Sequence, residues 1–132
     1  MEQPKKTRIC KKCQRELPLT TEFFYCRRNH KNNKYYFEGT CRTCRSLKHK
    51  HNLLMSSYGI SLEEYEQMRK NQNDKCLCCG RIPARGLVVD HCHTTNKVRG
   101  LLCNNCNCAL GQVFDRTDWA MKLMKYLVKY GS

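Results

Sequence analysis

The stretch VDHCHTTNKVRGLLCNNCN, residues 89–107, gathers several side chains that could do chemistry together. Asp90 and His91 are neighbours, His93 follows two residues later, and Asn107 comes directly after a Cys-x-x-Cys pair. Carboxylate and amide oxygens are ligands that suit magnesium or manganese, whereas a neutral His can accept a proton from water. The stretch therefore predicts a one-metal phosphodiesterase site, with Asp90 and Asn107 near the ion and His91 beside it.

Cysteines frame this stretch and a second one near the N-terminus. Eight of the twelve cysteines form four Cys-x-x-Cys pairs. Zinc takes four thiolates in a tetrahedron, and two such pairs supply them. Pairing in sequence order predicts two structural zinc sites, one formed by Cys10, Cys13, Cys41 and Cys44 and one by Cys76, Cys79, Cys103 and Cys106. An interleaved arrangement of the pairs is the alternative.

Four cysteines lie outside these sets, at positions 26, 78, 92 and 108. We expect them to be spare thiols, although Cys78 could replace its neighbour Cys79 as a ligand. The N-terminus lacks the apolar core of a signal peptide, and no run is apolar enough to span a membrane. This predicts a cytoplasmic location, in the host cell if a phage encodes the chain, where thiols stay reduced. A secreted disulfide scaffold is the alternative.

The charge is strongly positive and unevenly spread. The formal net charge is +14, and residues 1–50 hold 14 Lys and Arg against four Asp and Glu. Such an excess favours a polyanionic partner, and nucleic acid is the leading candidate. We expect the DNA backbone to be contacted by Arg27, Arg28, Lys31 and Lys34, and a phosphate to be clamped by Arg99.

The same basic stretch contains Tyr35, Tyr36 and Phe37, after the turn-forming KNNK. We expect a hairpin there, with the three aromatic residues in its core rather than forming a base-stacking platform. Ser61 and Glu64 predict a capping box at the start of a helix from residue 62 to about 72.

The second cysteine set encloses the order strand, turn, strand, helix. The segments are GLVVDH, TTNK, VRGLL and CNNCNCALG, with Gly111 ending the helix. Thr117 or Asp115 is expected to cap a last amphipathic helix that closes the small core. Beyond the two sets of Cys-x-x-Cys pairs, the sequence has no internal repeat.

Residues 58–111 carry a family resemblance. The segments YGISLEEYEQM and VDHCHTTNKVRGLLCNNCNCALG, with CLCCG between them, resemble the recombination endonuclease VII branch of the HNH nucleases, which have a ββα-metal fold. The resemblance implies that Asp90 and Asn107 hold a catalytic magnesium, that His91 is the general base and that His93 lies near the scissile phosphate. It also implies a structural zinc on the second cysteine set.

Two departures from the family pattern stand inside the matching stretch. Cys92 stands where many relatives have an acidic residue, and TTNK replaces a turn that usually contains glycine. Neither departure removes a residue with an implied catalytic role.

The expected fold class is small α+β. It consists of a basic zinc-ribbon-like module at 1–48, a helical connector at 49–75 and a ββα-metal nuclease core with a C-terminal helix at 76–132. The expected cofactors are two structural zinc ions and one catalytic magnesium or manganese ion.

The expected activity is metal-dependent cleavage of DNA, by nicking or by cutting both strands. The alternatives are an enzyme that resolves branched DNA, and a zinc-stabilised nucleic-acid-binding module without catalysis. The expected partner is double-stranded or branched DNA and not a membrane, and the sequence indicates no oligomeric state.

Overall fold

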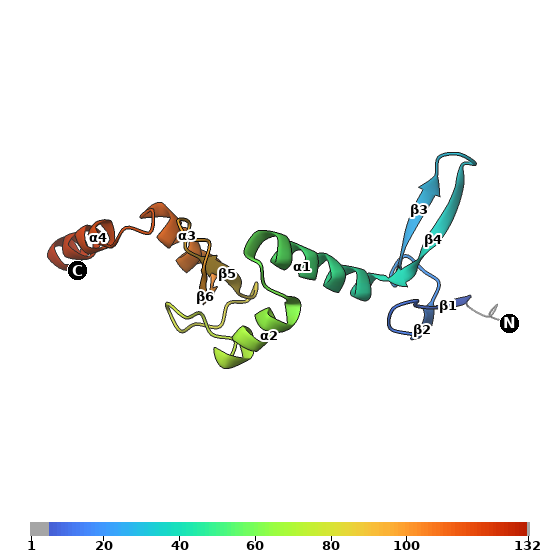
Figure 1. Cartoon of the computed structure of the whole chain (residues 1–132), viewed down its shortest axis with the longest axis horizontal. Coiled ribbons are helices and arrows are strands. Elements are labelled where there is room, and N and C mark those ends of the chain that lie inside the picture. The colour runs from blue at the N-terminus through green and yellow to red at the C-terminus, as the bar shows by residue number, and fades with distance from the viewer. Residues whose placement is uncertain (1–5, 132) are drawn as a thin grey trace. The chain divides into compact units, whose positions relative to one another are not determined.

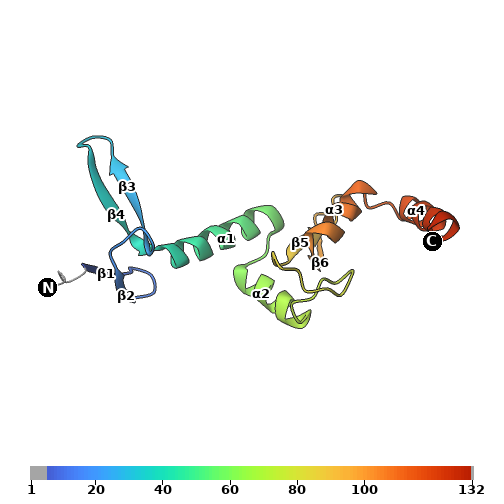
Figure 2. The ribbon, with the colours of Figure 1, turned by 180° about the vertical axis from the view of Figure 1, so that it is seen from behind.

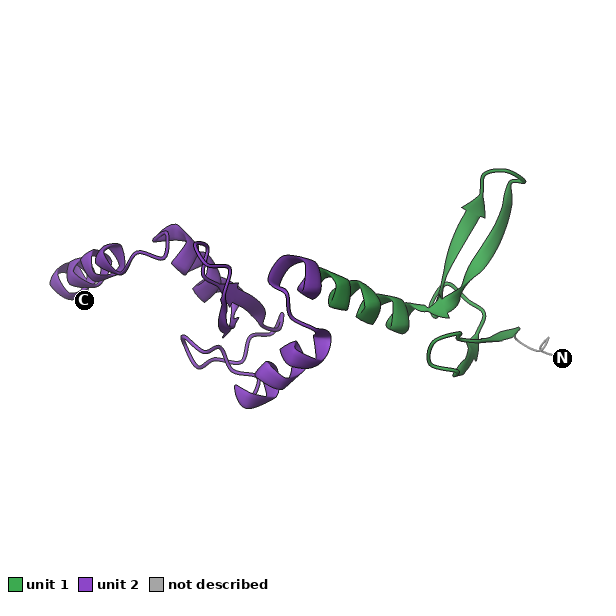
Figure 3. Cartoon of the chain, viewed as in Figure 1, with its two compact units in different colours: residues 1–53 green, residues 54–132 purple. Residues whose placement is uncertain are grey.

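The structure, a computed structural model, describes residues 6–131. It divides into two compact units, residues 1–53 and 54–132 (Figure 3), and the boundary falls within helix α1, Arg42–Tyr58. The three-part division at residues 48 and 75 stays a prediction.

The first unit consists of two antiparallel hairpins followed by a helix. Its strands are β1 (Thr7–Ile9), β2 (Glu16–Pro18), β3 (Phe24–Asn29) and β4 (Lys34–Cys41), and α1 begins directly after β4 (Figure 1). Asn33 adopts φ 56° in the turn between β3 and β4, a conformation that Asn tolerates better than most residues. The expected KNNK hairpin is thus present.

The core of the first unit is built around sulfur. Its buried residues are Cys10, Phe24, Cys41 and Cys44, and Phe37 packs against them. So small an apolar core needs a staple to hold it. The expected core position is correct for Phe37 but wrong for Tyr35 and Tyr36, which are 72% and 49% exposed because the outer part of the hairpin has no layer packed on it.

The second unit begins within α1 and contains the remaining elements. These are α2 (Leu62–Asn71), β5 (Val88–His91), β6 (Val98–Leu102), α3 (Asn104–Gln112) and α4 (Thr117–Tyr130). Ser61 caps α2, and the reciprocal bonds with Glu64 confirm the capping box. Helix α3 continues to Gln112, so Gly111 lies inside the helix and does not end it.

Helix α2 fixes the β5–β6 hairpin through two side chains. The Tyr65 hydroxyl donates to the carbonyl of Leu87 at 2.8 Å, just before β5. The Gln72 amide bonds both backbone groups of Leu101, accepting from its N–H at 2.9 Å and donating to its carbonyl at 2.8 Å. Gln72 therefore supplies the two backbone hydrogen bonds that a neighbouring strand would make to Leu101 of β6. Leu101 is fully buried.

The two units repeat one plan that the sequence alone showed only as cysteine pairs. In each, a Cys-x-x-Cys turn precedes an antiparallel hairpin, and a helix begins one residue after the third cysteine. The two turns also share their bonds, since the N–H of Cys10 donates to the Arg15 carbonyl and that of Cys76 to the Arg81 carbonyl. The repeat therefore includes the secondary structure as well as the cysteine pairs.

Helix α4 differs from expectation. It buries no residue, and its N-cap is Arg116 without a side-chain cap bond, so neither Thr117 nor Asp115 caps it. Its apolar side borders a groove of about 550 Å³ shared with α3, yet Leu127 stays 63% exposed. The helix lines a groove rather than closing a core. No helix within residues 6–131 combines the length and apolarity needed to cross a membrane.

Candidate active site

Two cysteine clusters form the frames of the two units. In each, the four Sγ atoms lie within 4.8 Å of one another, with the members Cys10, Cys13, Cys41 and Cys44, and Cys76, Cys79, Cys103 and Cys106. A tetrahedral zinc with Zn–S bonds of about 2.3 Å places its sulfurs about 3.8 Å apart. The Cys13–Cys41 and Cys79–Cys103 pairs, at 4.0 and 3.9 Å, fit that geometry.

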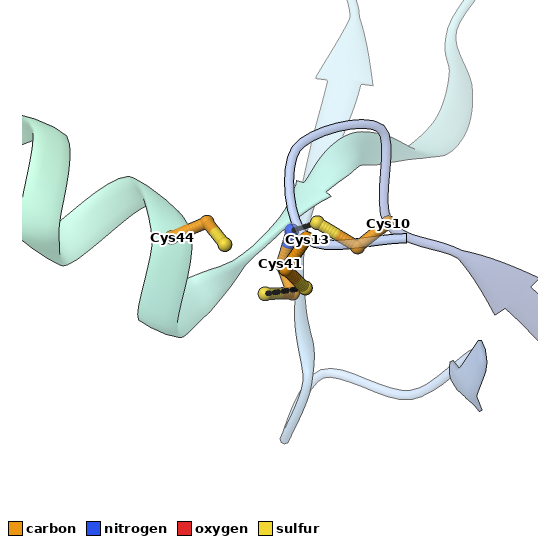
Figure 4. A group of neighbouring side chains, drawn as sticks. All are labelled: Cys10, Cys13, Cys41 and Cys44. Carbon is orange, nitrogen blue, oxygen red and sulfur yellow. Dashed lines mark hydrogen bonds between the residues drawn. The ribbon is translucent and has the colours of Figure 1, made fainter. Parts of the chain in front are cut away.

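The clusters confirm pairing in sequence order and exclude the interleaved arrangement. Figure 4 shows Cys44 reaching from α1 toward the other three sulfurs of the first cluster. All twelve cysteines are free thiols, and Cys79 rather than Cys78 is the cluster member. The sulfur sets fit two structural zinc ions.

Backbone N–H groups prepare one thiol of each cluster for metal binding. Those of Cys13 and Cys41 lower the pKa of Cys10 to about 6. Burial raises the pKa of Cys76, but N–H groups from Cys79 and Cys103 outweigh it and bring the value to about 6. A thiolate is the form that binds zinc.

A bulge in the β5–β6 hairpin shapes the proposed catalytic stretch. Asp90 pairs with Gly100, but His91 pairs with Val98, so Arg99 is the extra residue on β6. A bulge re-aims side chains and breaks the strict alternation of a strand. The alternation of β6 is therefore broken at Arg99, opposite Asp90 and His91 of β5.

Arg99 turns toward the carboxylate of Asp90. Its Nε and one terminal nitrogen each donate to Asp90 at 2.7 Å, and Asp90 is 7% exposed. The same terminal nitrogen donates to Asp115 at 2.9 Å. These bonds hold the pKa of Arg99 above its usual value, so the guanidinium is a fixed cation between two carboxylates.

Asp115 is a member of this site that the sequence did not indicate. Its bond from Arg99 is the main cause that lowers the pKa of its carboxyl. Its Oδ2 is buried without a hydrogen bond from any described residue, and it lies 4.0 Å from Nδ1 of His93. The turn after α3 places it there, with Phe114 and Asp115 both in the left-handed region.

The rings of His91 and His93 contact each other. Their centroids are 4.9 Å apart, and His91 also contacts Tyr58 edge-on at 5.3 Å. His91 is half-buried, whereas the side chain of His93 is 67% exposed. Tyr58 was not indicated as a site residue by the sequence, because it reaches the hairpin from the end of α1.

Asn107 lies in the first turn of α3, one residue after the cluster member Cys106. Its backbone N–H donates to the carbonyl of Cys103 at 3.1 Å, and α3 packs against β5. Cys103 is also the N-cap of α3, where its Sγ accepts from the N–H of Cys106 at 3.5 Å. The cysteine frame thus fixes the backbone that carries Asn107.

The turn between β5 and β6 accounts for one departure from the family pattern. Asn96 adopts φ 55°, the left-handed conformation that a glycine supplies without strain. Cys92 begins this turn, where its N–H donates to Lys97 and its carbonyl accepts from Asn96. A bond from the Thr95 side chain lowers the pKa of the Cys92 thiol.

The basic residues expected to contact DNA lie on the β3–β4 hairpin of the first unit, apart from Arg99. Arg27 forms an ion pair with Glu38, and Arg28 donates to the side chain of Asn33 at 2.5 Å. Lys31 and Lys34 are exposed. These residues belong to the first unit, whereas Arg99 belongs to the second.

The chain matches the family described as Recombination endonuclease VII over residues 51–129. The chain belongs to the recombination endonuclease VII family. It is thus a DNA endonuclease, a hydrolase of phosphodiester bonds. The family match includes α2, both strands of the β5–β6 hairpin and α3, the ββα order around the second cysteine frame.

Three similar proteins match a longer part of this chain than the family match covers. The Gene 59 protein of Mycobacterium phage L5 is 34% identical over 131 residues, which are 93% of this chain and 75% of that protein. Its namesake from Mycobacterium phage D29 is 33% identical over 132 residues, 94% of this chain and 75% of that protein. The crystal structure of the ββα-Me type II restriction endonuclease Hpy99I is similar at 26% identity, with a TM-score of 0.41, over 94% of this chain and 66% of that chain.

The first unit of this endonuclease VII family member lacks the polar set of the second. Arg45 follows the fourth cysteine of its frame, where Asn107 follows that of the second unit. Arg45 forms an ion pair with Glu38 and stacks over Tyr25 at 4.4 Å from the ring centroid. The repeated plan therefore carries one Asp-His-Asn set, in the second unit.

Proposed function

We propose that this nuclease cleaves DNA with His91 as the general base and with Asp90 and Asn107 as ligands of one magnesium or manganese ion. The observation that carries the proposal is the buried Asp90 beside His91 at the bulge of a zinc-framed ββα unit. The donor set fits such an ion, because it offers one carboxylate and one amide oxygen. The side-chain amide of Asn107 has no hydrogen-bond partner in the described part of the chain.

His91 takes a proton from the attacking water through a ring nitrogen. The water oxygen then bonds to phosphorus, the bond to the 3′ oxygen breaks, and that oxygen leaves. Ring contacts with Tyr58 and His93 restrict the orientation of the His91 imidazole, which favours a fixed proton acceptor. When bound, the divalent ion would supply stabilisation of the charge that develops on the phosphate.

Arg99 holds the Asp90 carboxylate in place and carries the positive charge of the site. As the expected phosphate clamp, it approaches DNA by exchanging one of its two aspartate partners for a phosphate oxygen. The exposed His93, whose Nδ1 lies 4.0 Å from Asp115, is placed to meet the phosphate.

The test is nicking of supercoiled plasmid by the purified, zinc-loaded protein with magnesium. His91→Ala should lower the rate by about 10²-fold or more, the usual contribution of a general base. His49→Ala, on the exposed surface of α1, is the matched control and should cleave as the wild type does. Equal nicking by wild type and His91→Ala would refute the assignment of the base.

The second candidate is cleavage of branched DNA, which membership in a family of recombination endonucleases favours. Rates on a four-way junction and on a linear duplex of the same sequence would separate the two substrates. Faster cleavage of the junction supports a resolving enzyme, whereas equal rates support a nuclease with weak structural preference.

A further inference from the structure

The outer part of the β3–β4 hairpin is uncovered on both faces. Its strands extend over six and eight residues, against four and five for β5 and β6. Residues 30–36 are all exposed, and Figures 1 and 2 show the ribbon projecting from the rest of the first unit. A two-stranded ribbon without a covering layer is only marginally stable in water, so a partner that covers it would stabilise it.

Two tyrosines stand out from this ribbon on opposite faces. Tyr35 is 72% exposed and pairs across the strands with Arg28; Tyr36 is 49% exposed and pairs with Arg27. Residues directly opposite in an antiparallel pair share a face. Each face therefore presents one aromatic ring beside one guanidinium.

The positive charge of the ribbon favours a polyanionic partner. The two strands and their turn contain one acidic residue, Glu38, and four basic residues: Arg27, Arg28, Lys31 and Lys34. Cations track a phosphate backbone, whereas an aromatic face stacks on a nucleobase. In an intact duplex the faces of the bases are covered by their neighbours, so a ring can stack only where bases are unpaired or splayed apart.

We propose that the β3–β4 hairpin binds DNA with unpaired bases, with Tyr35 and Tyr36 stacking on exposed bases and the hairpin cations contacting the backbone. This inference rests on the proposed DNA-cleaving function and deepens it, because it names the element and the residues that would recognise the substrate. The first unit then supplies recognition and the second supplies cleavage.

The experiment measures fluorescence anisotropy of labelled DNA without added magnesium and without chelator, so that cleavage plays no part. The probes are a perfect duplex and the same duplex with a central unpaired loop. Tyr35→Ala/Tyr36→Ala should weaken binding to the looped duplex by about fivefold or more, because stacking contributes roughly 1–3 kcal/mol per base. Binding to the perfect duplex should stay within twofold.

Two variants control for other causes. Tyr35→Phe/Tyr36→Phe keeps the rings and should bind the loop as the wild type does. Tyr126→Ala/Tyr130→Ala removes rings of similar exposure, 62% and 63%, from α4 and should change neither affinity. Zinc content of each variant shows that the first unit is folded.

The proposal is overturned by an unchanged affinity for the loop or by equal losses on both duplexes. It is also overturned if the alanine variant loses thermal stability without losing affinity, because the ribbon would then be covered by another part of the protein. Failure of the proposed chemistry would show instead in the plasmid assay with His91→Ala, which does not depend on these tyrosines.

Discussion

At the scale of single residues, the site is organised by a charge balance around Arg99. One guanidinium bonds both oxygens of the buried Asp90 and also Asp115. An ion pair of this kind costs much to break by removing one partner, because the other charge is left uncompensated. The three side chains therefore set the net charge that a divalent ion meets.

Asp115→Asn should weaken metal binding, because it removes one negative charge and leaves Asp90 as the only carboxylate bonded to Arg99. Hydrogen bonds to charged groups contribute about 1.5–3 kcal/mol, so we expect roughly tenfold weaker affinity. Loss of the electron paramagnetic resonance signal of free Mn²⁺ measures binding without cleavage. The control is Asp118→Asn, whose carboxylate bonds Arg116 at the protein surface. If both variants bind Mn²⁺ equally, Asp115 is not part of the site.

The sequence motif predicts the position of Asp90, His91 and Asn107 in one zinc-framed unit, but their catalytic roles stay predictions. It could not indicate Asp115, which follows Asn107 by eight residues with no fixed spacing. Asp115 reaches the site through two left-handed residues and a bond to a bulged arginine. Both features depend on tertiary structure rather than on residue type.

At the scale of elements, the sequence predicted a turn, cap or strand correctly where that feature depends only on neighbouring residues. The capping box at Ser61, the strands beside TTNK and the hairpin at KNNK depend on neighbouring residues, and the structure has all three. The errors concern what packs on each element. The periodicity of α4 and the aromatic run of β4 indicated apolar residues, but not whether another layer covers them.

Gln72→Leu should destabilise the second unit, because the N–H of Leu101 then loses its partner in a buried strand. Leaving a buried polar group unsatisfied costs about 1–3 kcal/mol. Gln67→Leu is the matched control on the same helix, since Gln67 is exposed and bonds only Asn71. Denaturant unfolding of the zinc-loaded proteins gives the free energies. Equal destabilisation by the two variants would contradict the bracing role of Gln72.

At the scale of the whole molecule, one plan framed by four cysteines occurs twice with different polar residues. The second unit carries Asn107 after its last cysteine and the first carries Arg45. The first unit also holds 14 of the 25 Lys and Arg but only four of the 11 Asp and Glu. This distribution agrees with the proposed division, in which the first unit binds DNA and the second cleaves it.

Lys31→Gln/Lys34→Gln should make DNA binding less sensitive to salt. Each phosphate contact contributes about 0.9 to the slope of log affinity against log salt concentration, so the slope should fall by about 1.8. Lys122→Gln/Lys125→Gln removes the same charge from exposed positions of α4 and should leave the slope unchanged. Identical slopes for the two pairs would show that the hairpin lysines do not contact phosphates.

Cys103 links the metal frame to the helix that carries Asn107. Its sulfur belongs to the zinc cluster and also caps α3. Peroxide or an alkylating reagent at this thiol would release the ion and uncap the helix in one event. The nuclease would then be inactivated by oxidants although no sulfur takes part in cleaving DNA, and its activity would depend on the reducing power of its surroundings.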